Sequence, residues 1–171
     1  MSILDPPQAM KPRPGEIALP FDPAHTAGDG RVVFIGRIRT PWATRADCPK
    51  NPREARERAR TASVDIDPSW RAGLQGLEKF SHAILLYWMH EARRDLIVQV
   101  PRHASAPRGV FSLRSPVRPN PIALSVVRLL SVDVVAGRLE IDAIDCLDGT
   151  PLIDIKPYLP GVDAVPDAGT G

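Results

Sequence analysis

The chain has 171 residues and a formal net charge of +2, a length that favours one domain with a substantial core. Its 19 prolines argue for many turns and few long helices, and no apolar run reaches the roughly 18 residues of a membrane span. The N-terminus lacks a charged region followed by an apolar core, so we expect no signal peptide and a cytoplasmic location.

The first part of the chain predicts an arm, a strand and a short helix. Residues 1–30 lack periodicity and are rich in proline and glycine, which predicts a flexible N-terminal arm. The segment 31–38, RVVFIGRI, predicts the first strand, with Val33 and Ile35 on one face. Asn51 followed by Pro52 is typical of an N-cap and first helical position, so a short helix should run to about residue 60.

The middle of the chain predicts a second helix and the strongest strand. A short strand is expected at 63–66, and Asp67 should cap a helix over 68–76. The expected buried side of this helix consists of Trp70, Leu74 and Leu77. The segment 80–90, FSHAILLYWMH, is apolar on both faces and therefore predicts a central strand, with His90 where the chain leaves the sheet.

Further strands are predicted at 95–100, 122–132, 138–144 and 152–155. The pair 122–132 and 138–144 indicates an antiparallel hairpin with one face in water. Many strands with short helices inserted between them favour a mostly β fold, an antiparallel sheet closed or nearly closed into a barrel. We expect this barrel to span residues 31–165 and a tail to occupy 166–171.

The loop GVFSLRSPVRPNP, at residues 109–121, is the strongest candidate for function. Its prolines each fix φ and remove a backbone donor, so Arg114, Arg118 and Asn120 should be held in fixed directions. Between Leu96 and Val132 the chain has arginines but no acid, which favours a phosphate-bearing or carboxylate-bearing partner. A solvated, proline-rich turn on a solvated face remains the alternative.

Other polar residues have two interpretations, functional and structural. Asp148, Asp154 and Lys156 lie on or beside the last predicted strand, where a solvent-facing edge explains Asp154 and Lys156 equally well. His90 and Glu91 follow the central strand, and such a histidine is more often structural. No glycine-rich nucleotide fingerprint and no metal-ligand spacing occurs in the sequence, so we expect neither a Rossmann site nor a metal.

Three segments together resemble the TsaA-like (TrmO/YaeB) family. They are GLEKFSH with His90 behind it, GVFSLRSPVRPNPIALS, and LDGTPLIDIKPYLP, in the family's order over residues 31–165. The resemblance implies a non-Rossmann antiparallel barrel that binds S-adenosylmethionine and forms a homodimer. It also implies methyl transfer to the exocyclic amine of threonylcarbamoyl-adenosine, next to the anticodon of tRNA.

The resemblance also implies residue roles. The positions matching the cofactor contacts of the family are Lys50, Asn51, Pro52, His90, Glu91, Arg114, Leu124, Leu147, Asp148, Gly149 and Thr150. The candidates for contact with tRNA are Arg114, Arg118, Asn120 and Lys156. Because the amine must lose a proton, the candidate acceptors are Asp148, Asp154 and His90.

Two rival functions remain open from the sequence. One is a barrel that binds S-adenosylmethionine but modifies a different small molecule or RNA. The other is an RNA-binding barrel that is not an enzyme, and failure to bind S-adenosylmethionine would favour it.

Overall fold

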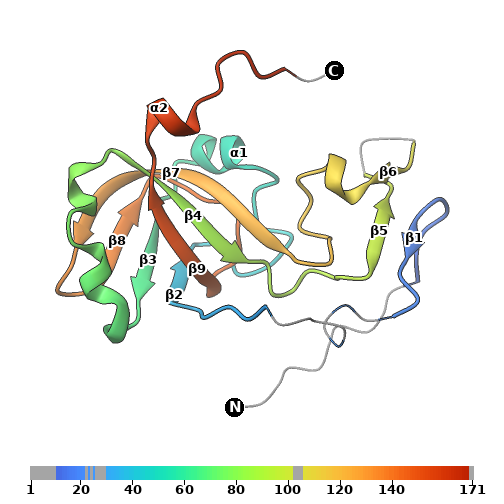
Figure 1. The fold of residues 1–171 in the computed structure, drawn as a ribbon, viewed down its shortest axis with the longest axis horizontal. Coiled ribbons are helices and arrows are strands. Elements are labelled where there is room, and N and C mark those ends of the chain that lie inside the picture. Colours follow the sequence, from blue (N-terminus) through green and yellow to red (C-terminus); the bar gives the residue numbers. More distant parts are fainter. Residues whose placement is uncertain (1–10, 22, 24, 26–29, 102–105, 170–171) are drawn as a thin grey trace. The chain divides into compact units, whose positions relative to one another are not determined.

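The computed structural model describes residues 11–21, 23, 25, 30–101 and 106–169. The chain divides into two compact units. The barrel unit, Val33–Trp88 with Leu124–Gly171, contains a closed β-barrel. The small-sheet unit, Met1–Val32 with Met89–Ala123, contains a three-stranded sheet. Figure 1 labels the elements of both.

The barrel closes in the order β2-β3-β8-β7-β4-β9, and β2 pairs antiparallel with both β3 and β9 (Figure 1). Its strands are β2 (Gly36–Arg39), β3 (Ala62–Ile66), β4 (His82–Trp88), β7 (Ile122–Asp133), β8 (Arg138–Ile141) and β9 (Thr150–Pro157). Short helical segments lie between or after them: α1 (Pro52–Glu57), the 3₁₀ turns η1 (Pro68–Leu74) and η2 (Leu77–Lys79), and α2 (Pro160–Asp163). The expected mostly β fold, an antiparallel barrel with short inserted helices, is confirmed.

Alternating side chains fill the interior of the barrel. On β8, Leu139 and Ile141 are fully buried, whereas Arg138 is exposed and Glu140 is half-buried. Burial of such a side chain contributes about 1.5–3 kcal/mol, so this layer dominates the stability of the unit. The largest fully buried members are Ile38, Val64, Leu85, Val127, Leu139, Ile141, Ile144 and Leu152. One polar contact lies among them, between the hydroxyls of Tyr87 and Ser125 at 2.9 Å.

The first strand begins later than the sequence predicts. Val33 and its neighbour Phe34 are 59% and 43% exposed, and the strand starts at Gly36. The backbone of Ile35 still bonds to both neighbouring strands, from its N to Leu152 O at 3.0 Å and from Asp67 N to its O at 3.0 Å. Residues 30–34 have no partner strand, so the β-branched segment before Ile35 is not part of the sheet.

The helix expected after Asp67 is a 3₁₀ helix, and this changes which side chains it buries. Leu74 and Leu77 are buried as predicted, but Trp70 is 45% exposed. A 3₁₀ helix has about three residues per turn, so positions four apart no longer share a face. Asp67 occupies the predicted N-cap position before Pro68, but its side chain makes no capping hydrogen bond.

The helix expected after Asn51 is confirmed with its cap. Asn51 Oδ1 accepts a hydrogen bond from Glu54 N at 2.9 Å, and Pro52 occupies the first turn. The helix, α1, ends at Glu57; Ala55 is its buried residue, and Arg56 bonds it to the barrel through Asp142 and the carbonyl of Val126.

The small-sheet unit has the strand order β1-β5-β6. Its elements are β1 (Ile17–Ala18), β5 (Leu96–Gln99), β6 (Arg108–Gly109) and the 3₁₀ turn η3 (Val110–Ser112). Part of the expected N-terminal arm is thus paired with β5. Residues 1–10, 22, 24 and 26–29 of that arm lie outside the described residues, as do Arg102 in the basic segment and residues 170–171 of the tail.

Candidate functional site

The turn Asp148-Gly149, just before β9, is bonded to β2 at several points. Gly149 has φ of 76°, a left-handed conformation that glycine adopts without strain. Its N donates to Ile38 O at 2.9 Å, and Asp148 N donates to Trp42 O at 2.9 Å. Arg37 NH1 donates to Gly149 O at 3.0 Å. These bonds hold the turn against β2, the strand that pairs with β9 in the closed barrel. We call this turn the Asp148 corner.

The carboxylate of Asp148 is held on one side and open on the other. Its Oδ1 accepts from Thr40 N at 3.1 Å, whereas its Oδ2 lies 3.9 Å from Arg39 NH1. The side chain is 45% exposed. A fixed, partly open carboxylate of this kind can bind a cation or accept a proton from a ligand.

Buried polar groups support the Asp148 corner from below. Thr150 is 1% exposed, and its hydroxyl donates to Leu147 O at 2.7 Å. The Thr40 hydroxyl donates to Cys146 O at 3.0 Å. Burial raises the pKa of the Cys146 thiol well above its usual range. The thiol therefore stays protonated at neutral pH and is no nucleophile.

The segment Lys50–Pro52 enters α1 with most of its polar groups already bonded. Asn51 caps the helix through its side chain, and Lys50 N donates to Glu54 Oε2 at 3.1 Å. That bond, with a second from Arg58, lowers the pKa of the Glu54 carboxyl. Pro52 has no backbone donor. The groups left for a ligand are backbone carbonyls and the exposed Lys50 ammonium.

Trp42 connects the Asp148 corner with α1, a role that the sequence did not indicate. Its indole N–H donates to Ile144 O at 3.0 Å, and the Arg58 guanidinium lies 5.3 Å from the ring centroid. Nearby, burial together with Asp145 raises the pKa of Cys48 to about 11. The end of α1, at Arg58, and the Asp148 corner thus both contact Trp42. A tryptophan beside a proline in an otherwise polar loop was the available signal.

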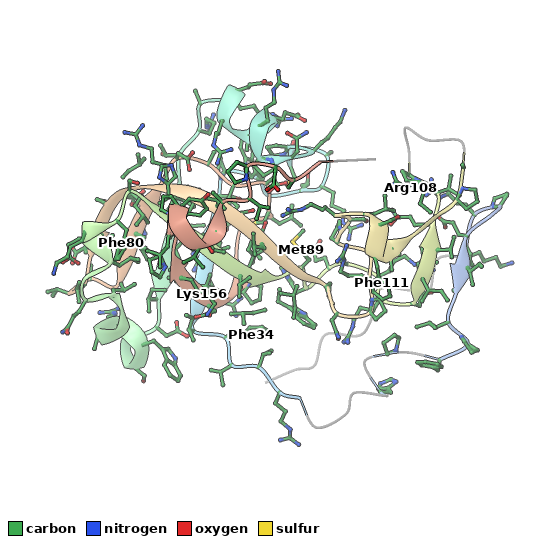
Figure 2. All side chains as sticks on the ribbon, turned by 45° about the horizontal axis from the view of Figure 1, so that its top comes forward. Phe34, Phe80, Met89, Arg108, Phe111 and Lys156 are labelled. Carbon is green, nitrogen blue, oxygen red and sulfur yellow. The ribbon has the colours of Figure 1, made fainter. Side chains whose placement is uncertain are left out.

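Asp154 and Lys156 form an ion pair of their own on β9, between Asp154 Oδ2 and Lys156 Nζ at 2.7 Å. Figure 2 labels Lys156 on the barrel unit. The other Asp154 oxygen accepts from Ile155 N at 2.9 Å. Asp154 lies four positions after Thr150, a distance of about 13 Å along β9. This pair therefore does not share one binding site with the Asp148 corner.

In the small-sheet unit, Arg118 braces the proline-rich loop. Its Nε donates to Ser115 O at 2.8 Å, and its NH2 donates to Val110 O at 3.3 Å and to Leu113 O. The predicted stiffness of this loop therefore comes from a guanidinium as well as from prolines. The Nε and NH2 donors of Arg118, which were expected to reach a ligand, are directed at the loop itself.

The other predicted residues of the small-sheet unit lie at its surface. Asn120 Oδ1 faces Arg94 NH2 at 3.5 Å, and Arg94 Nε donates to Pro119 O at 2.6 Å. His90 Nε2 lies 4.0 Å from Glu91 Oε1, and both side chains are partly exposed. Arg114 is exposed as well. Arg94, which the sequence reading did not single out, is thus the residue that fixes the end of the loop.

The structure groups the predicted residues by unit. Those of the barrel unit are Lys50, Asn51, Pro52, Leu124, Leu147, Asp148, Gly149, Thr150, Asp154 and Lys156. Those of the small-sheet unit are His90, Glu91, Arg114, Arg118 and Asn120. Among the described residues, no group of three or more histidine, cysteine or carboxylate side chains is arranged to hold a metal ion. Nor does that part of the chain contain a helix long and apolar enough to cross a bilayer.

Known proteins share this sequence and this fold. Residues 37–164 match the family model described as the tRNA-methyltransferase O N-terminal domain. A probable S-adenosyl-L-methionine-binding protein, VirR of Rhizobium radiobacter, is 42% identical over 82% of this chain and 75% of its own length. A probable S-adenosyl-L-methionine-binding protein of Methanothermobacter thermautotrophicus is 41% identical over 79% of this chain and 94% of its own.

Solved structures agree with the sequence relatives. The crystal structure of TrmO from Pseudomonas aeruginosa matches with a TM-score of 0.68 and 39% identity over 84% of this chain. The present chain spans 62% of that solved chain. The cofactor class implied by the family resemblance, S-adenosylmethionine, is the one in the names of the relatives. With the match over residues 37–164, the chain belongs to the family of the tRNA-methyltransferase O N-terminal domain.

Proposed function

We propose that this chain is an S-adenosylmethionine-dependent methyltransferase that methylates the exocyclic amine of threonylcarbamoyl-adenosine next to the anticodon of tRNA. The single observation that carries the proposal is the Asp148 corner, a rigid turn with a half-open carboxylate, within the region that matches the family. Family membership supports the reaction class, and the names of the relatives support the methyl donor.

The groups around the Asp148 corner fit the chemistry of the donor. A carboxylate and backbone carbonyls suit a molecule with a sulfonium and an ammonium, and half-buried Leu147 suits its adenosyl part. We assign donor binding in the barrel unit to Lys50–Pro52, Leu124 and Leu147–Thr150. When bound, S-adenosylmethionine supplies an electrophilic methyl group.

The residues of the chain position the acceptor and remove its proton. We propose Asp148 as the acceptor of the amine proton, because one of its oxygens has only a distant partner. Both oxygens of Asp154 already hold partners, at 2.7 and 2.9 Å. His90 is the second choice. Arg114 and Asn120 are proposed to meet tRNA, Lys156 to add an outlying phosphate contact, and Arg118 to hold their loop in shape.

The test compares two matched substitutions, Asp148→Asn and Asp154→Asn. Loss of a proton acceptor costs roughly 100-fold or more in rate, so Asp148→Asn should lose methyl transfer while Asp154→Asn keeps it within a few-fold. The measurement is mass spectrometry of tRNA nucleosides after reaction with labelled S-adenosylmethionine. Equal activity of the two variants would remove Asp148 from the mechanism and leave His90→Gln as the next variant to assay.

A different substrate is the second candidate, because the names of the relatives give S-adenosyl-L-methionine binding and no methyl acceptor. Calorimetry with S-adenosylmethionine separates the possibilities. Binding without methylation of tRNA favours another acceptor. No binding favours an RNA-binding barrel that is not an enzyme.

A further inference from the structure

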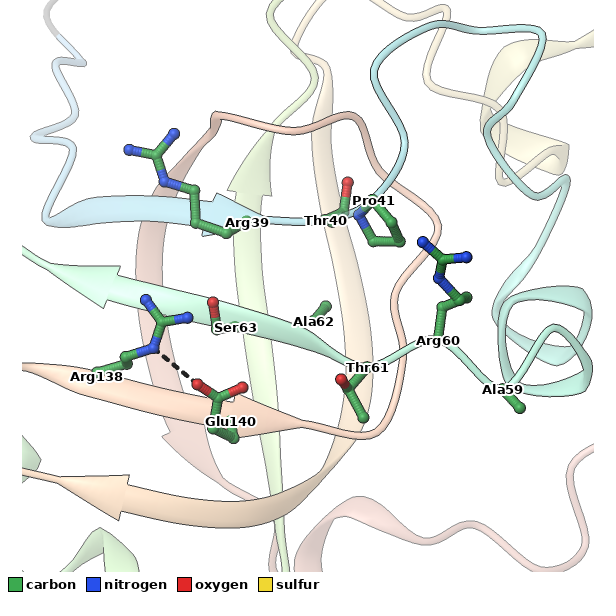
Figure 3. A pocket seen from close by; sticks show the side chains of 10 residues that line it. All are labelled: Arg39, Thr40, Pro41, Ala59, Arg60, Thr61, Ala62, Ser63, Arg138 and Glu140. Atoms are coloured by element: carbon green, nitrogen blue, oxygen red, sulfur yellow. Dashed lines mark hydrogen bonds and ion pairs between the residues drawn. The ribbon is translucent and has the colours of Figure 1, made fainter.

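The outer wall of the barrel contains an open pocket to which no ligand is assigned above, although Arg39 and Thr40 of its lining also contact Asp148. It has a volume of about 380 Å³ and lies over the ends of β2, β3 and β8 (Figure 3). The lining residues that matter for its chemistry are Arg39, Arg60, Ser63, Arg138 and Glu140. Three of these are arginines, against one carboxylate, and Figure 3 shows them arising from neighbouring segments.

Strand register explains why these side chains meet. Arg39 pairs with Ser63, and Ser63 pairs with Glu140, so the three form one row across the outer face of the sheet. Asp65 and Arg138 lie in the adjacent row. The alternate residues of these strands are buried in the barrel, which fixes the direction of the row. The pocket is therefore a product of the barrel itself and not of a loose loop.

Carboxylates hold two of the arginines in place without using all their donors. Asp65 accepts from Arg39 Nε at 3.1 Å and from Arg138 NH1 at 2.8 Å. Glu140 accepts from Arg138 Nε at 2.7 Å. A guanidinium has several N–H groups arranged as a fork, so each retains donors for another anion. The carboxylates also lower the net positive charge, which favours moderate affinity.

Arg60 is the third arginine, and it is held differently. It is exposed, and among the residues that the structure describes it has no hydrogen bond or ion pair. It follows Ala59, whose φ of 49° lies in the left-handed region that residues other than glycine rarely adopt. The chain leaves α1 through this strained residue and thereby delivers Arg60 to the rim of the pocket. Strain of this kind is concentrated at functional positions.

We propose that this pocket binds a phosphate group of the RNA backbone beside the Asp148 carboxylate, which lies 3.9 Å from Arg39 NH1. Arginine forks match phosphate oxygens, and the open, shallow form suits one phosphodiester whose flanking nucleotides stay in solvent. A pocket for a whole small molecule would instead bury most of its ligand. The inference rests on the proposed function for the identity of the polyanion as tRNA.

The experiment measures tRNA affinity in the absence of S-adenosylmethionine, over a series of salt concentrations. Arg60→Gln should weaken binding about five- to tenfold and reduce the salt slope by about one, as expected for one lost phosphate contact. The matched control is Arg53→Gln, which removes the same charge from α1, where Arg53 is 88% exposed and paired with Glu57. It should change affinity less than about twofold.

Each outcome decides the proposal. Unchanged tRNA affinity in Arg60→Gln, or equal losses in both variants, would overturn it, because the effect would then be absent or merely one of overall charge. Calorimetry with inorganic phosphate forms the second arm. An Arg60-dependent heat with free phosphate, without any effect on tRNA, would assign the pocket to a free anion and overturn the RNA source. Because the experiment measures binding and not methyl transfer, its outcomes can be interpreted even if the proposed reaction is wrong.

Discussion

Gly36 is the residue at which the barrel tolerates no side chain. A Cβ at this position would lie 2.1 Å from Asp65 O in the neighbouring strand. We expect Gly36→Ala to lower the free energy of unfolding by about 2–3 kcal/mol, because β2 and β3 would have to separate. Gly73→Ala is the control, since nothing lies within 4 Å of a Cβ there. Urea unfolding measures both, and equal stability of the two variants would show that the strands adjust without cost.

At the same scale, several single-residue roles were within reach of the sequence and several were not. Asn51 as a helix cap follows from its position before Pro52, and the structure confirms it. The role of Arg118 as a brace did not follow, because its acceptors are backbone carbonyls that the loop conformation brings together. The bond from Thr40 N to Asp148 joins residues far apart in the chain, and no local pattern contains that information.

The segment just before β5 contains an ion pair that should make the small-sheet unit sensitive to acid. Arg93 binds Asp95 through two bonds, at 2.8 and 2.7 Å, and these bonds lower the pKa of Asp95 in the folded chain. The lowered pKa means that the pair stabilises the fold at neutral pH. Its contribution is lost as pH falls below about 4, toward the folded pKa.

The test of this element is Asp95→Asn, measured by hydrogen exchange of the β5 amides. We expect about 1 kcal/mol of lost protection at pH 7 and no difference from the unaltered chain at the lowest accessible pH. Glu57→Gln, which breaks the exposed pair with Arg53, is the control and should have no measurable effect on β5. A difference that persists unchanged in acid would mean that packing, not charge, is responsible.

For the whole molecule, the sequence predicted the class of fold but not how its parts divide. Alternation along 122–132 and 138–144 led to the hairpin of β7 and β8, because those strands have one wet face. The sequence placed the start of the first strand too early. Val33 and Phe34 are residue types typical of a strand, but they have no neighbouring strand to pair with. The sequence also proposed both Asp148 and Asp154 as proton acceptors, although Asp148 precedes β9 and Asp154 lies within it.

The pairing of β2 with β9 closes the barrel, and the proposed donor site lies on that same seam. A ligand bound where β2 meets β9 would therefore hold the first and last strands of the barrel together. The melting temperature should rise when S-adenosylmethionine is added. At a ligand concentration of a hundred times the dissociation constant, the added stability should be about 2.7 kcal/mol. Thr40→Pro removes the backbone N–H that donates to Asp148. It should weaken binding of the ligand and reduce the rise in melting temperature. An undiminished rise in that variant would locate the ligand elsewhere.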